Sequence, residues 1–466
     1  MFEVRGSITA FSAAVRRVPG LELIDEEELA SDATDKAPVA YLMVPDIQAL
    51  RNLESLWRRW LQGTLVRGET PWRDVFALLR DLRPWGPSDR VRSAESDILS
   101  EEIFGRGDDD PVRIEMELVF RSLAQIGNES EGEVRAAVIS AGGRIVSRVR
   151  IEDIAYHALL VDLPVRAVRE IVQRSPNGIA GLESVMHIRP QSVASSIEVA
   201  DQTDGTIPVP IAARGEPILA LFDGVPVSGH PLLSTHLVVD DQFGLEPLTP
   251  VADRFHGTAM ASLVIHGDRN RPQPSLPRRI HIVPVLGAND KFPNDRLIVD
   301  LIYSAVVALR EGEGATAPDV LVVNLSLGNP RRRFYLQLSA WARLLDRLAY
   351  RYGLLFIVSA GNCTEPFGIP EFANSIAFED APATRRAEET LRALGAVSSE
   401  RRLFSPAETV NGLTVGAFNE DAVSANERAA ARAMVDPYGE LRMANPSSAL
   451  VHRFHETNPM RRIHFP

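Results

Sequence analysis

The spacing of hydrophobic positions changes along the chain and divides it into regions. Near the N-terminus, apolar residues recur at helical spacing: Leu50, Leu53, Trp57 and Leu61. A second helix is predicted over 71–82. We therefore predict a mainly helical domain over 1–105. A small core or an aromatic partner-binding surface would each explain its clustered tryptophans, and we prefer the core.

The spacing of apolar residues changes after the three aspartates at 108–110. Apolar residues alternate over 112–120, as in a half-buried strand. A helix, two strands, a second helix and a last strand are then predicted over 134–139, 144–151, 156–163, 165–174 and 185–188. The resulting order over 112–190 is βαββαβ, a ferredoxin-like (split-βαβ) arrangement. Many folds share this order, so by itself it indicates no function.

The third region alternates strands with helices. Residues 191–216 are rich in small and polar residues and are predicted to be a linker. Continuous apolar strands follow over 218–222, 280–286, 320–325 and 354–358. One helix between them is expected to be capped by Asn294 and Asp295, and another to close at Gly353. We expect 217–466 to form an α/β domain, a parallel sheet with helices on both faces.

Composition narrows the class of protein. The net charge of −12 over 466 residues argues against nucleic-acid binding. A single cysteine, Cys363, excludes an internal disulfide, and the first 20 residues lack the apolar core of a signal peptide. No run is long enough for a membrane helix. We expect a soluble cytoplasmic protein with no membrane contact and no metal or other cofactor; calcium binding is left undecided.

Three polar residues lie where parallel α/β sheets usually carry their functional residues, at the carboxyl ends of strands or at the starts of helices. They are Asp223, His256 and Asn362, each beside a glycine. A carboxylate can orient an imidazole that takes a proton from a serine, and an amide can stabilise the resulting oxyanion. Singly, the three could be a helix cap, a structural histidine and a turn residue. Together and in this order, they favour the catalytic interpretation.

These segments resemble the subtilase family of subtilisin-like serine peptidases. The similarity rests on Asp-Gly at 223, His-Gly-Thr-Ala-Met-Ala from 256, Asn-Leu-Ser-Leu-Gly from 324 and Ser-Ala-Gly-Asn ending at 362, and it covers about 217–450. It implies that Asp223 and His256 are triad members and that Asn362 is the oxyanion donor. It also implies that Ser326, Leu327 and Gly328 line the cleft for an extended polypeptide substrate.

The resemblance breaks at the nucleophile. No Gly-Thr-Ser-Met-like segment follows Ala417, and only Ser424, Ser447 and Ser448 remain as candidates. We expect the chain to be C-terminally incomplete, with a frameshift or a natural basic tail as the two explanations for its last residues. Cys363, beside Asn362, is interpreted as a plain small residue rather than a nucleophile.

Two functional hypotheses follow. The first is a serine endopeptidase whose chain, as it stands, is inactive. The second is a non-catalytic pseudoprotease that binds peptides or a partner. The layout is also similar to large bacterial intracellular subtilases found beside AAA ATPases, which makes an AAA ATPase a candidate partner. The 112–190 segment resembles a subtilase propeptide, and a permanent accessory domain is the equal alternative.

Overall fold

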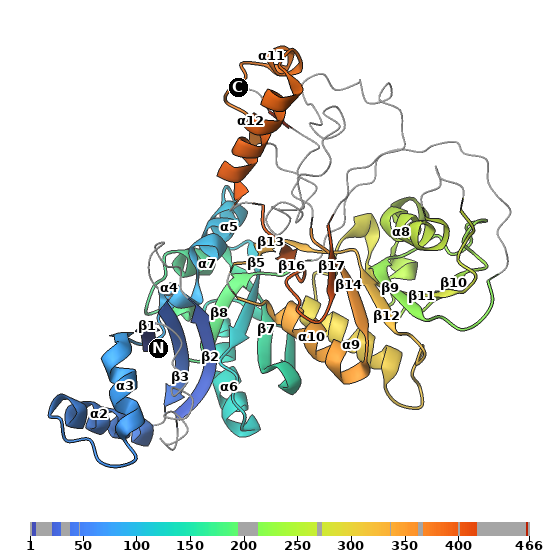
Figure 1. Ribbon diagram of the computed structural model, residues 1–466. Coiled ribbons are helices and arrows are strands. Elements are labelled where there is room, and N and C mark those ends of the chain that lie inside the picture. Colours follow the sequence, from blue (N-terminus) through green and yellow to red (C-terminus); the bar gives the residue numbers. More distant parts are fainter. Residues whose placement is uncertain are drawn as a thin grey trace. The chain divides into compact units, whose positions relative to one another are not determined.

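The computed structural model describes residues 2–5, 21–28, 38–45, 47–193, 213–267, 273–335, 337–361, 367–398, 401–416 and 463–464. The chain divides into two compact units, Met1–Gln191 and Ser192–Pro466. Figure 1 labels their elements.

The first unit contains the predicted βαββαβ order. Its elements are β5 (Pro111–Leu118), α6 (Ala124–Ser140), β6 (Arg144–Ile151), β7 (Tyr156–Pro164), α7 (Val165–Val172) and β8 (Val185–Pro190). The strands form an antiparallel sheet in the order β6-β7-β5-β8. Strand β7 is buried along its whole length, because it lies inside the sheet.

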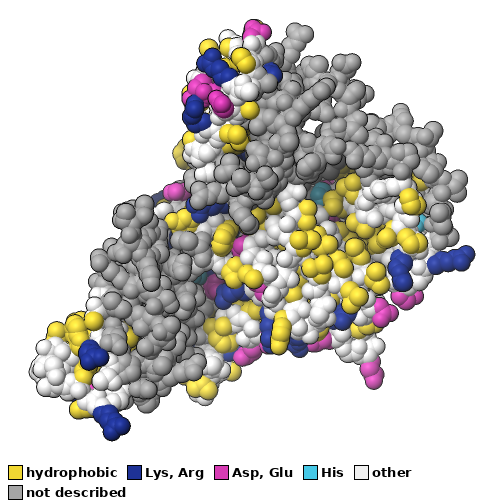
Figure 2. Space-filling model, in the orientation of Figure 1, with side chains coloured by type: hydrophobic (Ala, Val, Ile, Leu, Met, Phe, Trp, Pro, Cys, Tyr) yellow, Lys and Arg dark blue, Asp and Glu magenta, His cyan; other side chains and the backbone are white. Residues whose placement is uncertain are grey.

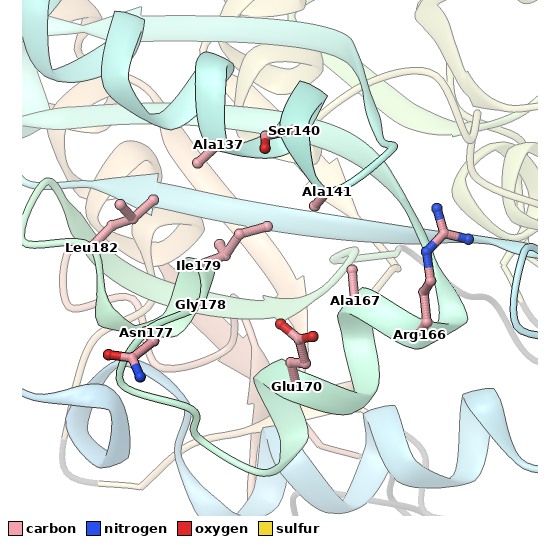
Figure 3. A pocket seen from close by; sticks show the side chains of 10 residues that line it. All are labelled: Ala137, Ser140, Ala141, Arg166, Ala167, Glu170, Asn177, Gly178, Ile179 and Leu182. Atoms are coloured by element: carbon pink, nitrogen blue, oxygen red, sulfur yellow. The ribbon is translucent and has the colours of Figure 1, made fainter.

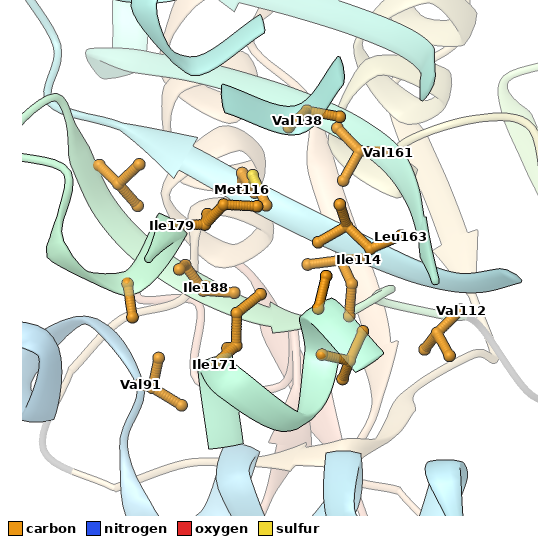
Figure 4. Close-up of a cluster of buried hydrophobic side chains, with 14 of the residues drawn as sticks. Val91, Val112, Ile114, Met116, Val138, Val161, Leu163, Ile171, Ile179 and Ile188 are labelled. Atoms are coloured by element: carbon orange, nitrogen blue, oxygen red, sulfur yellow. The ribbon is translucent and has the colours of Figure 1, made fainter. Parts of the chain in front are cut away.

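The core of this unit lies between the sheet and its helices. Alternate residues of β5, namely Val112, Ile114, Met116 and Leu118, are almost fully buried. They meet Val134 and Val138 of α6 and Val168 and Ile171 of α7 (Figure 4). The apolar face of the strand, which has a period of two residues, and the apolar face of α7, which has a helical period, therefore pack together in one layer.

The N-terminal region requires a correction. Helices α2 (Ile47–Leu61) and α3 (Thr70–Leu78) lie near the predicted helices, and α4 (Pro87–Arg90) and α5 (Ser93–Ile103) follow. The region also holds an antiparallel sheet of β1 (Phe2–Arg5), β2 (Leu21–Glu28), β3 (Pro38–Pro45) and β4 (Leu79–Leu82), ordered β2-β3-β1-β4. The prediction of a mainly helical domain therefore missed this sheet. The acidic run in β2, Leu-Glu-Leu-Ile-Asp-Glu-Glu-Glu, interrupts the alternation that reveals a strand.

Helices α4 and α5 join the N-terminal region to the βαββαβ segment. Helix α5 packs on α7 and β8. The guanidinium of Arg90, only 4% exposed, donates hydrogen bonds to the carbonyl oxygens of Val185 (2.8 Å) and Ala180 (3.2 Å). These contacts explain why the two predicted regions share one compact unit.

The second unit is built on a six-stranded parallel sheet. Its order is β10 (Leu237–Val239), β11 (Ile280–Leu286), β9 (Leu219–Gly224), β12 (Val322–Leu325), β14 (Leu355–Ser359) and β17 (Leu413–Val415). Every neighbouring pair in it is parallel. Helices flank the sheet, so the predicted α/β class is confirmed (Figure 1).

Three helices cover this sheet. Helix α8 (Phe255–His266) packs Ala261 and Ile265 onto β9 and β11, while α9 (Ile298–Arg310) and α10 (Ala340–Tyr352) pack against each other. The prediction that Asn294 and Asp295 cap α9 is wrong: Leu297 holds the cap position, with no side-chain bond. The predicted end of α10 at Gly353 is confirmed.

Smaller elements surround the sheet. They are β13 (Asn329–Arg333), β15 (Phe367–Gly368), α11 (Ser375–Glu379), α12 (Ala383–Ala396), β16 (Phe404–Ser405) and β18 (Ile463–His464). Hydrophobic side chains reach the surface of the molecule in several places (Figure 2), and on α8 Phe255 and Leu263 are about half exposed. Helix α8 therefore buries one face and presents the other.

Candidate active site

Asp223 lies near the carboxyl end of β9, a strand hydrogen-bonded on both sides. Its side chain is fully buried. The carboxylate oxygen Oδ1 accepts the backbone N–H of Gly224 at 2.7 Å, whereas Oδ2 is buried and accepts no hydrogen bond from the described residues. A buried carboxylate with free acceptor capacity is stable only beside a donor or a positive charge.

His256 is the second residue of α8, and the turn before it is firmly held. Arg254 pairs with Glu246 at 3.0 Å and donates to the carbonyl oxygen of Thr249. The hydroxyl of Thr258 donates to the carbonyl of Arg254 and accepts the N–H of Val227 at 2.9 Å. The start of α8 is thus attached to the segment that follows Asp223.

Two glycines allow the helix and the strand to meet. A Cβ atom on Gly257 would lie 2.0 Å from the carbonyl oxygen of Gly224, and one on Gly224 would lie 3.3 Å from the nitrogen of Gly257. No side chain fits in this contact. The glycines that follow Asp223 and His256 therefore have a packing reason: they bring the two backbones together.

The consequence is a close pair. The Nδ1–H of His256 donates to Oδ1 of Asp223 at 2.5 Å, with the imidazole only 4% exposed. Burial lowers the pKa of His256, but the hydrogen bond and charge of Asp223, together with the charge of Asp290, outweigh burial and raise it. Within the part of the chain that the structure describes, Nε2 makes no hydrogen bond. This ring nitrogen is available as a base.

Asp290 is a further carboxylate at the pair that the sequence analysis missed. It ends the short turn after β11, and its Oδ2 accepts the backbone N–H of His256 at 3.3 Å. The available signal was the one used for Asp223, a polar residue just after a buried strand. Asn-Asp is such a common turn sequence, however, that the signal is weak.

The predicted cleft residues follow β12. The hydroxyl of Ser326 donates to the side-chain oxygen of Asn324 at 2.9 Å, Leu327 is fully buried, and Gly328 packs against Phe404. Gly361, at the end of the neighbouring strand β14, also packs against Phe404. The two glycine-containing segments therefore converge on one aromatic side chain.

Several predicted residues lie outside the described part of the chain. They are Asn362, Cys363, Ser424, Ser447 and Ser448. The structure thus brings Asp223 and His256 together and places Ser326, Leu327 and Gly328 after β12, the strand next to the one that carries Asp223.

A cavity of about 430 Å³ lies elsewhere, in the first unit. It is lined by Ala137 of α6, by Ala141 directly after that helix, by Arg166, Ala167 and Glu170 of α7, and by the turn that holds Asn177 (Figure 3). Neither member of the Asp-His pair lines it. The small alanines on both helices account for the open space, and we assign it no part in the candidate chemistry.

Among the described residues, no group of three or more His, Cys, Asp or Glu side chains is arranged to hold a metal ion. No helix in the described ranges has the length and apolar character needed to cross a bilayer.

Comparison with known proteins identifies the family. No curated protein matches the chain. The model of the subtilase family matches residues 216–457, just over half of the sequence and nearly the whole second unit. The matched range contains the parallel sheet and the Asp223–His256 pair. The chain therefore belongs to the subtilase family of subtilisin-like serine peptidases.

Proposed function

We propose that the second unit is a serine endopeptidase domain in which His256 is the general base and Asp223 orients its imidazole. The observation that carries this proposal is the 2.5 Å hydrogen bond from Nδ1 of His256 to Oδ1 of Asp223. It fixes the imidazole tautomer so that Nε2 is the basic nitrogen, and it supplies a negative charge beside the ring when the ring becomes positive.

The proposed reaction is acyl transfer. Nε2 of His256 takes the proton of a serine hydroxyl as the serine oxygen bonds to the peptide carbonyl carbon. The side chain of Asn362 donates a hydrogen bond to the oxyanion that forms. The C–N bond then breaks, the leaving amine takes the proton from His256, and water hydrolyses the acyl-enzyme in a second round. Backbone groups of Ser326–Gly328 would hold the polypeptide substrate as an added strand.

The printed sequence contains no recognisable segment for the nucleophilic serine. No Gly-Thr-Ser-Met-like segment follows Ala417, and Ser424, Ser447 and Ser448 lie in other sequence contexts. We therefore propose that the chain as printed has negligible peptidase activity. In triad enzymes, loss of the nucleophile leaves roughly 10³–10⁴-fold acceleration over water.

A second candidate function is a binding module without catalysis. The missing serine motif favours it, and the intact pair argues against it, because peptide binding needs no charged His-Asp pair. Under this hypothesis the cleft binds peptides, or it binds a partner such as an AAA ATPase in the cytoplasm. Residues 112–190 would act as an inhibitory propeptide or as a permanent accessory domain in either case.

The test combines labelling and turnover on the purified chain. A fluorophosphonate probe reports a reactive serine, and fluorescent casein reports hydrolysis. We expect neither signal from the printed chain. If extending the reading frame beyond codon 450 adds a serine-bearing segment, both signals should appear and His256→Ala should abolish them.

A matched control comes from a second His-carboxylate pair in the same unit. The Nε2 of His281 lies 3.3 Å from Oδ2 of Asp240, and in the sheet His281 is opposite Ala220 rather than Asp223. Asp240→Asn should leave labelling and turnover unchanged in the extended chain. Equal losses from Asp240→Asn and His256→Ala would contradict the proposed site. Tight casein-peptide binding with no labelling in any frame would favour the binding module.

A further inference from the structure

Asp290 approaches the catalytic pair from the strand next to β9. In the parallel pairing of β11 with β9, Leu286 is opposite Gly224. The turn that follows Leu286 therefore crosses the end of β9 just after Asp223. Its last residue, Asp290, is brought to the start of α8, so its position follows from the sheet register.

The Asp290 carboxylate lies against His256 and against Gly224, the residue after Asp223. Oδ2 accepts the backbone N–H of His256 at 3.3 Å. Oδ1 is buried and accepts no hydrogen bond from the described residues, and it would lie 2.7 Å from a Cβ atom on Gly224. Gly224 thus leaves room for Asp290 as well as for Gly257. Any larger residue at position 224 would push this carboxylate away.

The local backbone is held in an unfavourable conformation. Asn289 and Asp290 have φ angles of 56° and 51°, in the left-handed region. Non-glycine residues pay an energetic cost there, and a buried carboxylate oxygen without a donor adds to it. Such strain persists where the surroundings enforce it, and it concentrates at functional sites.

We propose that Asp290 is a positioning residue for His256, which fixes the start of α8 and provides a second negative charge that favours the imidazolium form. This inference rests on the proposed function, because an imidazolium forms when His256 takes the serine proton. Asp223 would orient the ring through Nδ1, and Asp290 would hold the backbone that carries it.

The electrostatics of the site agree with this role. Asp223 and Asp290 face His256, and Asp253 faces Asp290. Burial raises the pKa of Asp290, contact with His256 opposes the rise, and the charges of Asp223 and Asp253 add to it. The two carboxylates repel each other, and a positive charge on the nearby imidazole offsets that repulsion.

The test is an NMR titration of His256 in the full chain, which requires no turnover. Histidine side chains are isotope-labelled, and the His256 signal is the one that disappears in His256→Ala among the ten histidines. Asp290→Asn keeps an oxygen that can accept the N–H but removes the charge. Asp290→Ser is a second uncharged variant with an acceptor, and Asp290→Ala removes both. Asp253→Asn is the matched control.

We expect the pKa of His256 to fall in all three Asp290 variants and to stay unchanged in Asp253→Asn. The melting temperature should fall more in Asp290→Ala than in the Asn and Ser variants. An unchanged His256 pKa in folded Asp290→Asn and Asp290→Ser would overturn the inference, as would an equal fall in Asp253→Asn. If the pKa of His256 falls in Asp223→Asn but not in the Asp290 variants, only the role of Asp290 is refuted. If the pKa of His256 does not change in Asp223→Asn either, the Asp-His site itself is refuted.

Discussion

Gly257 and Gly224 approach so closely that one added Cβ atom on Gly257 would lie 2.0 Å from the carbonyl oxygen of Gly224. This contact joins the first turn of α8 to the end of β9. The Asp223–His256 hydrogen bond spans the same junction. The geometry of the pair therefore depends on backbone packing as much as on the two side chains.

Gly257→Ala is expected to destabilise the fold and separate the pair. The overlap forces the start of α8 away from β9, and overpacking of this kind costs about 1–3 kcal/mol. The midpoint of urea unfolding should fall, and the His256 signal should lose its dependence on Asp223. Gly229→Ala is the control, since no atom lies within 4 Å of its Cβ position. Equal behaviour of the two variants would contradict the contact.

Asp223→Asn should lower stability in a pH-dependent way. His256 has a pKa raised by Asp223, so the contribution of this pair is fully present below the unfolded histidine value of about 6.5 and is lost as pH rises through the folded pKa. The difference in unfolding free energy between wild type and variant should thus be largest near pH 5. Breaking a buried pair costs about 3–5 kcal/mol. If the difference in unfolding free energy instead grew towards pH 9, the prediction would be wrong.

Gly361→Ala tests the convergence on Phe404. The new Cβ would lie 2.6 Å from the Phe404 ring, on a backbone with φ of 107°. We expect a loss of at least about 1 kcal/mol in unfolding free energy. In the double variant Gly361→Ala with Phe404→Ala, the overlap with the ring should disappear, whereas the contact with Cβ of residue 404 at 2.8 Å and the backbone part should remain. Strictly additive losses in this cycle would show that the two residues are not in contact.

The core of the first unit gives a simpler test. Leu159 is fully buried between the sheet and the helices, so Leu159→Ala should cost about 2–5 kcal/mol. Leu123, which precedes α6, is 65% exposed. Leu123→Ala should change the unfolding free energy by less than about 0.5 kcal/mol. Denaturant melts monitored by Trp85, whose indole N–H bonds to Met186, would report both variants.

The sequence predicts those elements whose formation is marked by a local hydrophobic pattern. Buried parallel strands such as β11 are continuous apolar runs, so their bounds could be predicted closely. Asp223 and His256 were found because each stands at the end or start of such an element. Strand β10 was missed because it has only three residues and lies at the edge of the sheet.

Asp290 illustrates what local patterns cannot reveal. Its role depends on the register between β9 and β11 and on a turn geometry that no hydrophobic period encodes. The N-terminal strands were missed for a related reason: long-range pairing stabilises β2, and its own sequence is acidic. Contacts between segments distant in the sequence thus set the limit of the sequence analysis.

The place of β9 inside the sheet has a consequence for local unfolding. Its amides are bonded on both sides, so they should exchange with solvent only when the whole sheet opens. Helix α8 has a half-exposed outer face and can detach at a smaller free-energy cost. The imidazole would then leave its carboxylate while the sheet stays intact. Loss of the Asp223–His256 pair on mild heating should accordingly precede global melting, and hydrogen exchange should identify α8 as the first segment to open.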